Sequence, residues 1–99
     1  MVSTYEAVEA IVRSLGRIEI VARERYVLFR TTRIFADLVI MTDAVRVAVH
    51  LKREVADPIF IKVVHDKKRV TLVAKLSDPS GAERLRAYLK EAYEYSLTP

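Results

Sequence analysis

The sequence predicts an α+β fold of two layers, in which an antiparallel sheet of five or six strands carries an N-terminal and a C-terminal helix on one face. Three observations predict it. Both ends of the chain carry apolar residues at helical spacing. Between them, short runs rich in β-branched and aromatic residues alternate apolar with polar side chains. Most of these runs are separated by short turns, which favour antiparallel neighbours. A chain of 99 residues has room for one core, so we expect a single domain spanning residues 1–99.

Residues 3–15 predict the first helix. Ser3 and Glu6 have the spacing of a capping box, which starts a helix. Gly16 is a natural C-terminal cap, because glycine tolerates the backbone conformation found there. Between these ends runs one apolar stripe at helical spacing, formed by Tyr5, Val8, Ile11, Val12 and Leu15.

Five segments predict strands, and a sixth is ambiguous. The five are residues 18–21, 25–31, 34–41, 44–52 and 69–76. Segment 44–52 alternates most regularly and places Arg46, His50 and Lys52 on its polar side, as in a half-buried antiparallel strand. Residues 59–64 fit either an edge strand or a short helix. We expect consecutive strands to pair in order, as a meander.

The last segment predicts a second helix. Asp78 followed by Pro79 fits a helix cap with proline at the first helical position, and Ser80 with Glu83 offers a second capping box. An apolar face follows at helical spacing, formed by Ala82, Leu85, Leu89 and Ala92 and flanked by Tyr88 and Tyr93.

The composition excludes several classes of protein. The chain has no Cys, which excludes disulfides, a thiolate metal site and a cysteine nucleophile. It also has no Asn and no Gln, a composition typical of proteins from hot environments. The apolar runs are far shorter than the roughly 18 residues needed to span a bilayer, and the N-terminus lacks the basic region of a secretory signal. We therefore expect a cytoplasmic protein without membrane contact.

No motif predicts catalysis, a metal or a cofactor. Asp66-Lys67-Lys68 has the Asp-x-Lys form of a nuclease core, in which carboxylates hold Mg²⁺ and the lysine orients water. A turn between strands is the favoured interpretation, because aspartate is common in turns. His50 and His65 lack the spacing of zinc ligands, and the two glycines stand too far apart for a phosphate-binding loop. We expect a non-catalytic protein with no metal and no cofactor.

Several runs of residues resemble a known family. They are Tyr26-Val27-Leu28-Phe29-Arg30, Phe35-Ala36-Asp37-Leu38, Asp57-Pro58 and Leu89-Lys90-Glu91-Ala92-Tyr93-Glu94. The family is an uncharacterised small domain that often closes proteins with a restriction-nuclease-like N-terminal half, some of them labelled predicted transport protein. Its members usually carry Gly-His-Trp-Gly where this chain has His65-Asp66-Lys67-Lys68, so no ligand role is carried over to that loop. The resemblance implies an accessory module beside nucleic-acid enzymes.

The sheet face that the helices leave uncovered, called the open face below, is the candidate binding surface. The predicted alternation places on it Tyr26, Arg30, Arg46, His50, Lys52, Arg69 and Lys75, with Asp37 as the main acidic member. A basic sheet with aromatic residues is typical of proteins that hold single-stranded nucleic acid. The other interpretation is a solvated face with charges paired across strands, which the modest net charge of +4 favours.

Self-association is the alternative function. Phe35 and Val39 would make the open face apolar enough to pair two copies. Tyr93 and Tyr95 lie off the main stripe of the last helix and are further candidates for a dimer contact. The sequence thus predicts a small binding module that contacts nucleic acid without sequence preference, or one that acts by homodimerisation or protein docking.

Overall fold

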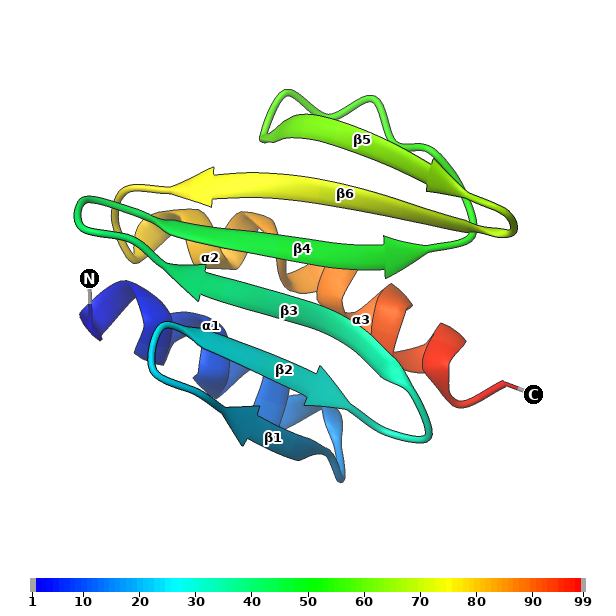
Figure 1. Ribbon diagram of the computed structural model, residues 1–99, viewed down its shortest axis with the longest axis horizontal. Helices are drawn as coiled ribbons and strands as arrows, with labels where there is room; N and C mark the ends of the chain where they lie inside the picture. The colour runs from blue at the N-terminus through cyan, green and yellow to red at the C-terminus, as the bar shows by residue number, and fades with distance from the viewer. Residues whose placement is uncertain (1, 99) are drawn as a thin grey trace.

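The computed structural model describes residues 2–98 and shows one antiparallel sheet with the helices on one face (Figure 1). Helix α1 spans Val2–Leu15, and the C-terminal segment forms α2, Ser80–Arg84, and α3, Arg86–Ser96. The strands are β1 Glu19–Ala22, β2 Tyr26–Arg30, β3 Ile34–Ile40, β4 Val45–Leu51, β5 Phe60–Asp66 and β6 Arg69–Leu76. The predicted α+β fold is confirmed, and the ambiguous segment after Pro58 is a strand. Within residues 2–98, no helix is both long and apolar enough to cross a membrane.

The strand order is β1-β2-β3-β4-β6-β5, and all neighbouring strands are antiparallel. The predicted meander is wrong at its last step, because β4 pairs with β6 and β5 lies outside β6 at the edge (Figure 1). Burial explains this order. Adjacent strand residues point to opposite faces, and in β6 both Leu72 and Val73 are buried. Strand β5 is exposed along nearly its whole length, so it takes the edge.

The core lies between the sheet and the helices. Leu38 of β3 pairs in register with Val47 of β4, which pairs in turn with Ala74 of β6. Val12 of α1 and Leu89 of α3 cover this side of the sheet, and all five side chains are fully buried. Burying one large aliphatic side chain stabilises the fold by roughly 1.5–3 kcal/mol. The apolar stripes predicted for the two helices are therefore their core-facing sides.

The helix ends agree only in part with the prediction. Helix α1 begins before Ser3, which is exposed inside the first turn and does not cap it. Asp78 does act as predicted, because its Oδ1 accepts the backbone N–H of Ser80 at 2.9 Å. The C-terminal helix is divided at Leu85, whose N–H donates to the carbonyl oxygen of Ala82 at 3.0 Å. This bond spans three residues and tightens the backbone there.

Gly16 follows α1 at a position that disfavours any other residue. Its φ is +153°, a conformation that L side chains rarely adopt, and a Cβ there would lie 2.2 Å from the hydroxyl oxygen of Tyr93. The close approach of Tyr93 thus joins the end of α1 to α3, and glycine is favoured for both reasons.

Phe35 lies on the helix side of the sheet, which corrects the prediction that it belongs to the open face. Its side chain is 1% exposed, and its ring packs edge-on against Tyr93 with 5.7 Å between the ring centroids. The cause is a shift of the β2–β3 register between Phe29 and Arg30. Such a bulge breaks the regular alternation of faces and redirects a side chain.

Candidate functional site

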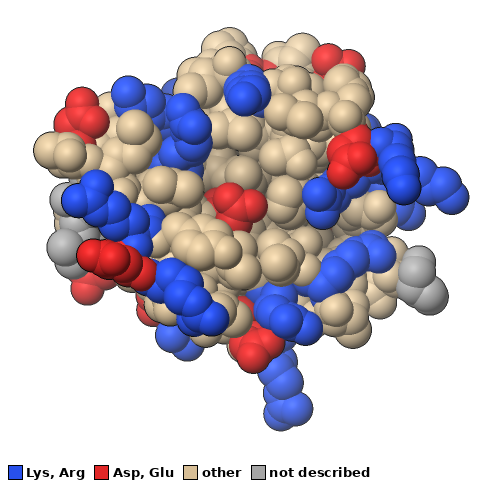
Figure 2. All heavy atoms as spheres, viewed as in Figure 1, with Lys and Arg blue, Asp and Glu red and all other residues tan. Residues whose placement is uncertain are grey.

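The open face is turned away from the helices, and Figure 2 looks onto it. Lysine and arginine gather toward its rim, whereas the middle is largely uncharged around one acidic group. The register explains this pattern, because Asp37 of β3 lies beside Ala48 of β4, which lies beside Val73 of β6. The charge is therefore divided between the ends of the sheet instead of covering the face.

One end of the open face holds Arg46 and Lys75. These two residues are register partners on β4 and β6, and Val39 of β3 is the other neighbour of Arg46. Val39 pairs in turn with Tyr26, whose side chain is 42% exposed. Within residues 2–98, neither Arg46 nor Lys75 forms an ion pair. These four predicted residues therefore do lie together and remain accessible.

Two other predicted cationic residues already have partners. Nε2 of His50 lies 3.4 Å from Oδ2 of Asp37, and its Nδ1 lies 2.9 Å from Oγ1 of Thr71. Both ring nitrogens are thus engaged in a side chain that is only 8% exposed. Nε of Arg30 lies 3.1 Å from Oε1 of Glu19 on β1. His50 and Arg30 therefore already have partners within the fold.

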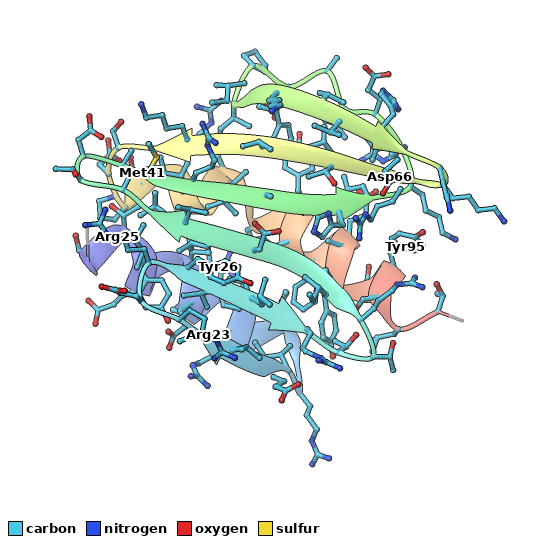
Figure 3. The ribbon with its side chains drawn as sticks, viewed as in Figure 1. Arg23, Arg25, Tyr26, Met41, Asp66 and Tyr95 are labelled. Carbon is cyan, nitrogen blue, oxygen red and sulfur yellow. The ribbon has the colours of Figure 1, made fainter. Side chains whose placement is uncertain are left out.

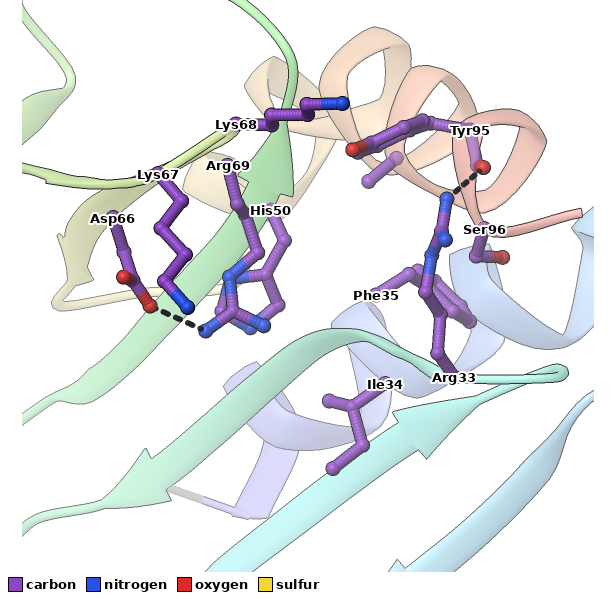
Figure 4. A pocket seen from close by; sticks show the side chains of 11 residues that line it. Arg33, Ile34, Phe35, His50, Asp66, Lys67, Lys68, Arg69, Tyr95 and Ser96 are labelled. Atoms are coloured by element: carbon purple, nitrogen blue, oxygen red, sulfur yellow. Dashed lines mark hydrogen bonds and ion pairs between the residues drawn. The ribbon is translucent and has the colours of Figure 1, made fainter. Parts of the chain in front are cut away.

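A groove of about 440 Å³ at the other end of the sheet concentrates positive charge (Figure 4). Its cationic residues are Arg33, Lys67, Lys68 and Arg69, and its one carboxylate, Asp66, lies 3.7 Å from Arg69. In the part of the chain that the structure describes, Arg33, Lys67 and Lys68 have no ion-pair partner. Side chains from the β5–β6 turn, the start of β3 and the end of α3 meet here, near the labels of Asp66 and Tyr95 in Figure 3.

Tyr95 contacts two of the cationic side chains at this end of the sheet, Arg33 and Lys52. Nη2 of Arg33 donates to the carbonyl oxygen of Tyr95 at 2.7 Å, and the guanidinium carbon lies 4.5 Å from the centroid of the ring. Nζ of Lys52 lies 4.7 Å from the same centroid. Lys52 was predicted on the open face, but β4 ends at Leu51 and the lysine contacts α3 instead. Cation–π attraction holds both cations against the ring.

The turn between β5 and β6 is strained at Lys67. Its φ is +55°, and among the described residues it is the one non-glycine residue with a positive φ. A left-handed backbone costs an L residue roughly 1–2 kcal/mol, and glycine would avoid that cost. Strain of this kind tends to persist at functional sites. A lysine at this position lines the groove.

The residues predicted to contact a second copy do not form one surface. Phe35 is buried, and Tyr93 is half-buried between Phe35 and Gly16. The ring of Tyr95 contacts Arg33 and Lys52 at the end of the sheet. Only Val39, 36% exposed, lies on the open face as predicted.

The Asp66-Lys67-Lys68 run joins the end of β5 to the start of β6. Asp66 has Arg69 as its ion-pair partner. Within residues 2–98, no group of three or more His, Cys, Asp or Glu side chains could hold a metal ion. The Asp-x-Lys run is thus the hairpin turn that the sequence favoured.

Comparison with protein families identifies the family of this chain. The model of a family described as "Domain of unknown function (DUF5655)" matches residues 1–96. The chain belongs to the DUF5655 family. No curated protein and no solved structure matches this DUF5655 domain.

Sequence reasoning missed three cations of the groove in this DUF5655 domain. The pair Lys67-Lys68 is predicted to lie in a turn, and Arg33 lies in the short connection between the strands predicted at 25–31 and 34–41. The signal that was present is the lysine pair itself, which fills a two-residue hairpin turn where glycine and asparagine are usual. The sequence near these cations could not reveal that they lie beside Tyr95, because strand β6 separates the β5–β6 turn from the C-terminal helices.

Proposed function

We propose that this DUF5655 domain is a non-catalytic module that binds single-stranded nucleic acid through its sugar–phosphate backbone. One observation carries the proposal, namely a groove in which four cationic side chains surround about 440 Å³ with one carboxylate. Cations that replace the counterions of phosphates supply essentially all of the free energy of non-specific binding. The accessory position beside restriction-nuclease-like enzymes, which the family resemblance implies, supports the same function.

The individual cations suit phosphate contacts. Arg33 is held by the ring and the carbonyl oxygen of Tyr95, so little side-chain freedom is lost when it binds. Its planar guanidinium can donate to two phosphate oxygens at once. Lys67 and Lys68 stand at the tip of the hairpin and act as point charges.

The open face offers a path for the rest of the strand. Arg69 at the groove and Lys75 at the far end both belong to β6, and at ~3.3 Å per residue they lie about 20 Å apart. Bases would lie over the middle of the face, which is uncharged except for Asp37, and stack on the exposed ring of Tyr26. Arg46 and Lys75 would take phosphates. Because the chain has no Asn or Gln, it has no side-chain amide that could recognise adenine through paired hydrogen bonds. Little sequence preference is therefore expected.

Fluorescence anisotropy with end-labelled single-stranded DNA, single-stranded RNA and duplex DNA at low salt tests this proposal. Lys68→Glu should lower the affinity for single strands roughly tenfold and reduce the slope of log K against log salt by about 1. Lys90→Glu is the matched control, because Lys90 is also an exposed lysine but lies on α3 and does not line the groove. No binding at low salt, or equal losses in both variants, would contradict the proposal.

The alternative proposal is that the open face docks a protein or a second copy. The observation that favours it is the exposure of Tyr26 and Val39, 42% and 36% respectively, which are register partners on β2 and β3. Light scattering of Val39→Asp against the native chain checks it. A native dimer that this substitution abolishes supports docking through the open face, and an unchanged mass contradicts it.

A further inference from the structure

Strand β5 is an outer edge of the sheet, and three of its six exposed side chains are apolar. Ile61, Val63 and Val64 are 58%, 36% and 40% exposed. Such an edge also presents backbone N–H and C=O groups without strand partners, which is a template for pairing with another strand. The other edge, β1, has four residues and its apolar side chains are half-buried. The sheet therefore has one long, exposed and partly apolar edge. The connection from β4 passes near it, since Oε2 of Glu54 lies 3.7 Å from Nε2 of His65.

We infer that β5 pairs antiparallel with β5 of a second copy, about a two-fold axis at Val64. The pairing of β5 with β6 is irregular between Phe60 and Lys62 and regular from Lys62 to Asp66. Val64 is the centre of this regular part. A two-fold axis there pairs the segment with itself, placing Val64 opposite Val64 and Lys62 opposite Asp66 of the second copy. Each copy contributes the same surface, as a closed dimer requires.

Charge complementarity specifies this register. Lys62, Val64 and Asp66 share the open side of the sheet, because their register partners Val73, Thr71 and Arg69 do. A lysine on an edge strand normally discourages pairing, but here it meets an opposite charge twice, once on each side of the axis. Moving the axis to Val63 would place both Lys62 side chains opposite Val64 and would leave Asp66 without its partner. Opposite charges directly across strands stabilise a sheet, and like charges destabilise it.

The dimer is expected to depend on protein concentration, because one strand from each copy makes a small interface. Only Asp66 among its paired residues lines the groove, so the inference is separate from the proposed binding of nucleic acid. Anisotropy and mass measurements on the same protein keep the two questions apart.

Charge exchange across the axis is the first test, read by sedimentation velocity over a range of concentrations. Lys62→Asp should abolish the dimer because it places two pairs of carboxylates opposite each other. Lys62→Asp combined with Asp66→Lys should restore the dimer, since every pair is again of opposite charge. A native chain that stays monomeric, a Lys62→Asp dimer as stable as the native one, or a double variant that remains monomeric would each overturn the inference.

A cysteine at the axis is the second test, and the chain has no other cysteine. Directly opposed strand residues lie within the span of a disulfide. Val64→Cys should therefore form a disulfide-linked dimer under mild oxidation. Val39→Cys is the control, because Val39 has a similar exposure, 36% against 40%, but lies on β3, which has neighbouring strands on both sides. Equal cross-linking of the two variants, or none at position 64, would overturn the inference.

Discussion

The guanidinium carbon of Arg33 lies 4.5 Å from the ring centroid of Tyr95, and Nζ of Lys52 lies 4.7 Å from the same point. One aromatic ring near the end of α3 thus holds two cations that leave the sheet at different strands. Each contact of this kind is worth roughly 0.5–1 kcal/mol at an exposed site. Tyr95 therefore acts on the groove by positioning Arg33, one of its cationic side chains.

Two substitutions of Tyr95 distinguish the contribution of its ring from that of its hydroxyl. Tyr95→Ala should lower the affinity for single-stranded nucleic acid several-fold, because Arg33 and Lys52 lose the ring that orients them. Tyr95→Phe should bind almost as the native chain does, because the π face remains. Anisotropy at low salt measures both, and circular dichroism confirms that each variant is folded. Equal affinities of the Ala and Phe variants would contradict the positioning role.

Lys67→Gly should change stability and binding in opposite directions. Glycine removes a left-handed strain of roughly 1–2 kcal/mol, but the greater entropy of the unfolded chain offsets ~0.4–1 kcal/mol of this gain. The free energy of unfolding should therefore rise by up to about 1.6 kcal/mol. Affinity for nucleic acid should fall, because one cation leaves the groove. Urea denaturation and anisotropy measure the two effects. Lys67→Ala is the control, since it loses the charge and keeps the strain.

Arg46→Glu combined with Lys75→Glu tests whether a bound strand crosses the sheet. The double variant should bind long single strands much more weakly, because it reverses both charges at the far end of the open face. Its affinity for a dinucleotide, which the groove alone can hold, should stay close to native. Anisotropy for long strands and competition by the dinucleotide measure this difference. An equal loss for both ligands would contradict the path along the sheet.

Asp57 makes the fold sensitive to acid. Its carboxylate accepts the backbone N–H of Ile59 at 3.0 Å and the hydroxyl of Tyr88 at 2.6 Å, and these bonds lower the pKa of Asp57 below its usual value. The same bond to Asp57 raises the pKa of the Tyr88 hydroxyl. A carboxyl whose pKa is lowered by folding stabilises the fold fully above its unfolded pKa, about 3.9, and loses this stabilisation as the pH falls through the folded value.

Asp57→Asn should therefore melt at a lower temperature than the native chain at neutral pH. The difference between the two melting temperatures should begin to shrink as the pH falls below about 4, because Asp57 is then protonated in the unfolded chain, and it should vanish once the folded carboxyl is protonated at lower pH. Differential scanning calorimetry across this range checks the prediction. Asp43→Asn, in the exposed turn before β4, is the control and should show a small difference at every pH. A difference for Asp57→Asn that does not vary with pH would contradict the assignment.

Much of the fold could be predicted from the chain because local patterns determine it. The alternation in β4 and β6 correctly separates Val47 and Ala74, which face the core, from Arg46 and Lys75, which face solvent. The helical stripes likewise identify Val12 and Leu89 as core residues. Each of these predictions needs only the period of the element, and the period is a property of neighbouring residues.

The place of β5, the side taken by Phe35 and the composition of the groove were decided by tertiary structure alone. The edge position of β5 depends on β6 being buried on both faces, and the bulge that turns Phe35 inward depends on the pairing of two strands. The groove brings Arg33, the turn of Lys67 and Lys68, and Tyr95 together from separate parts of the chain. No local period encodes such a meeting, because it results from how strands and helices pack against one another over long distances in sequence.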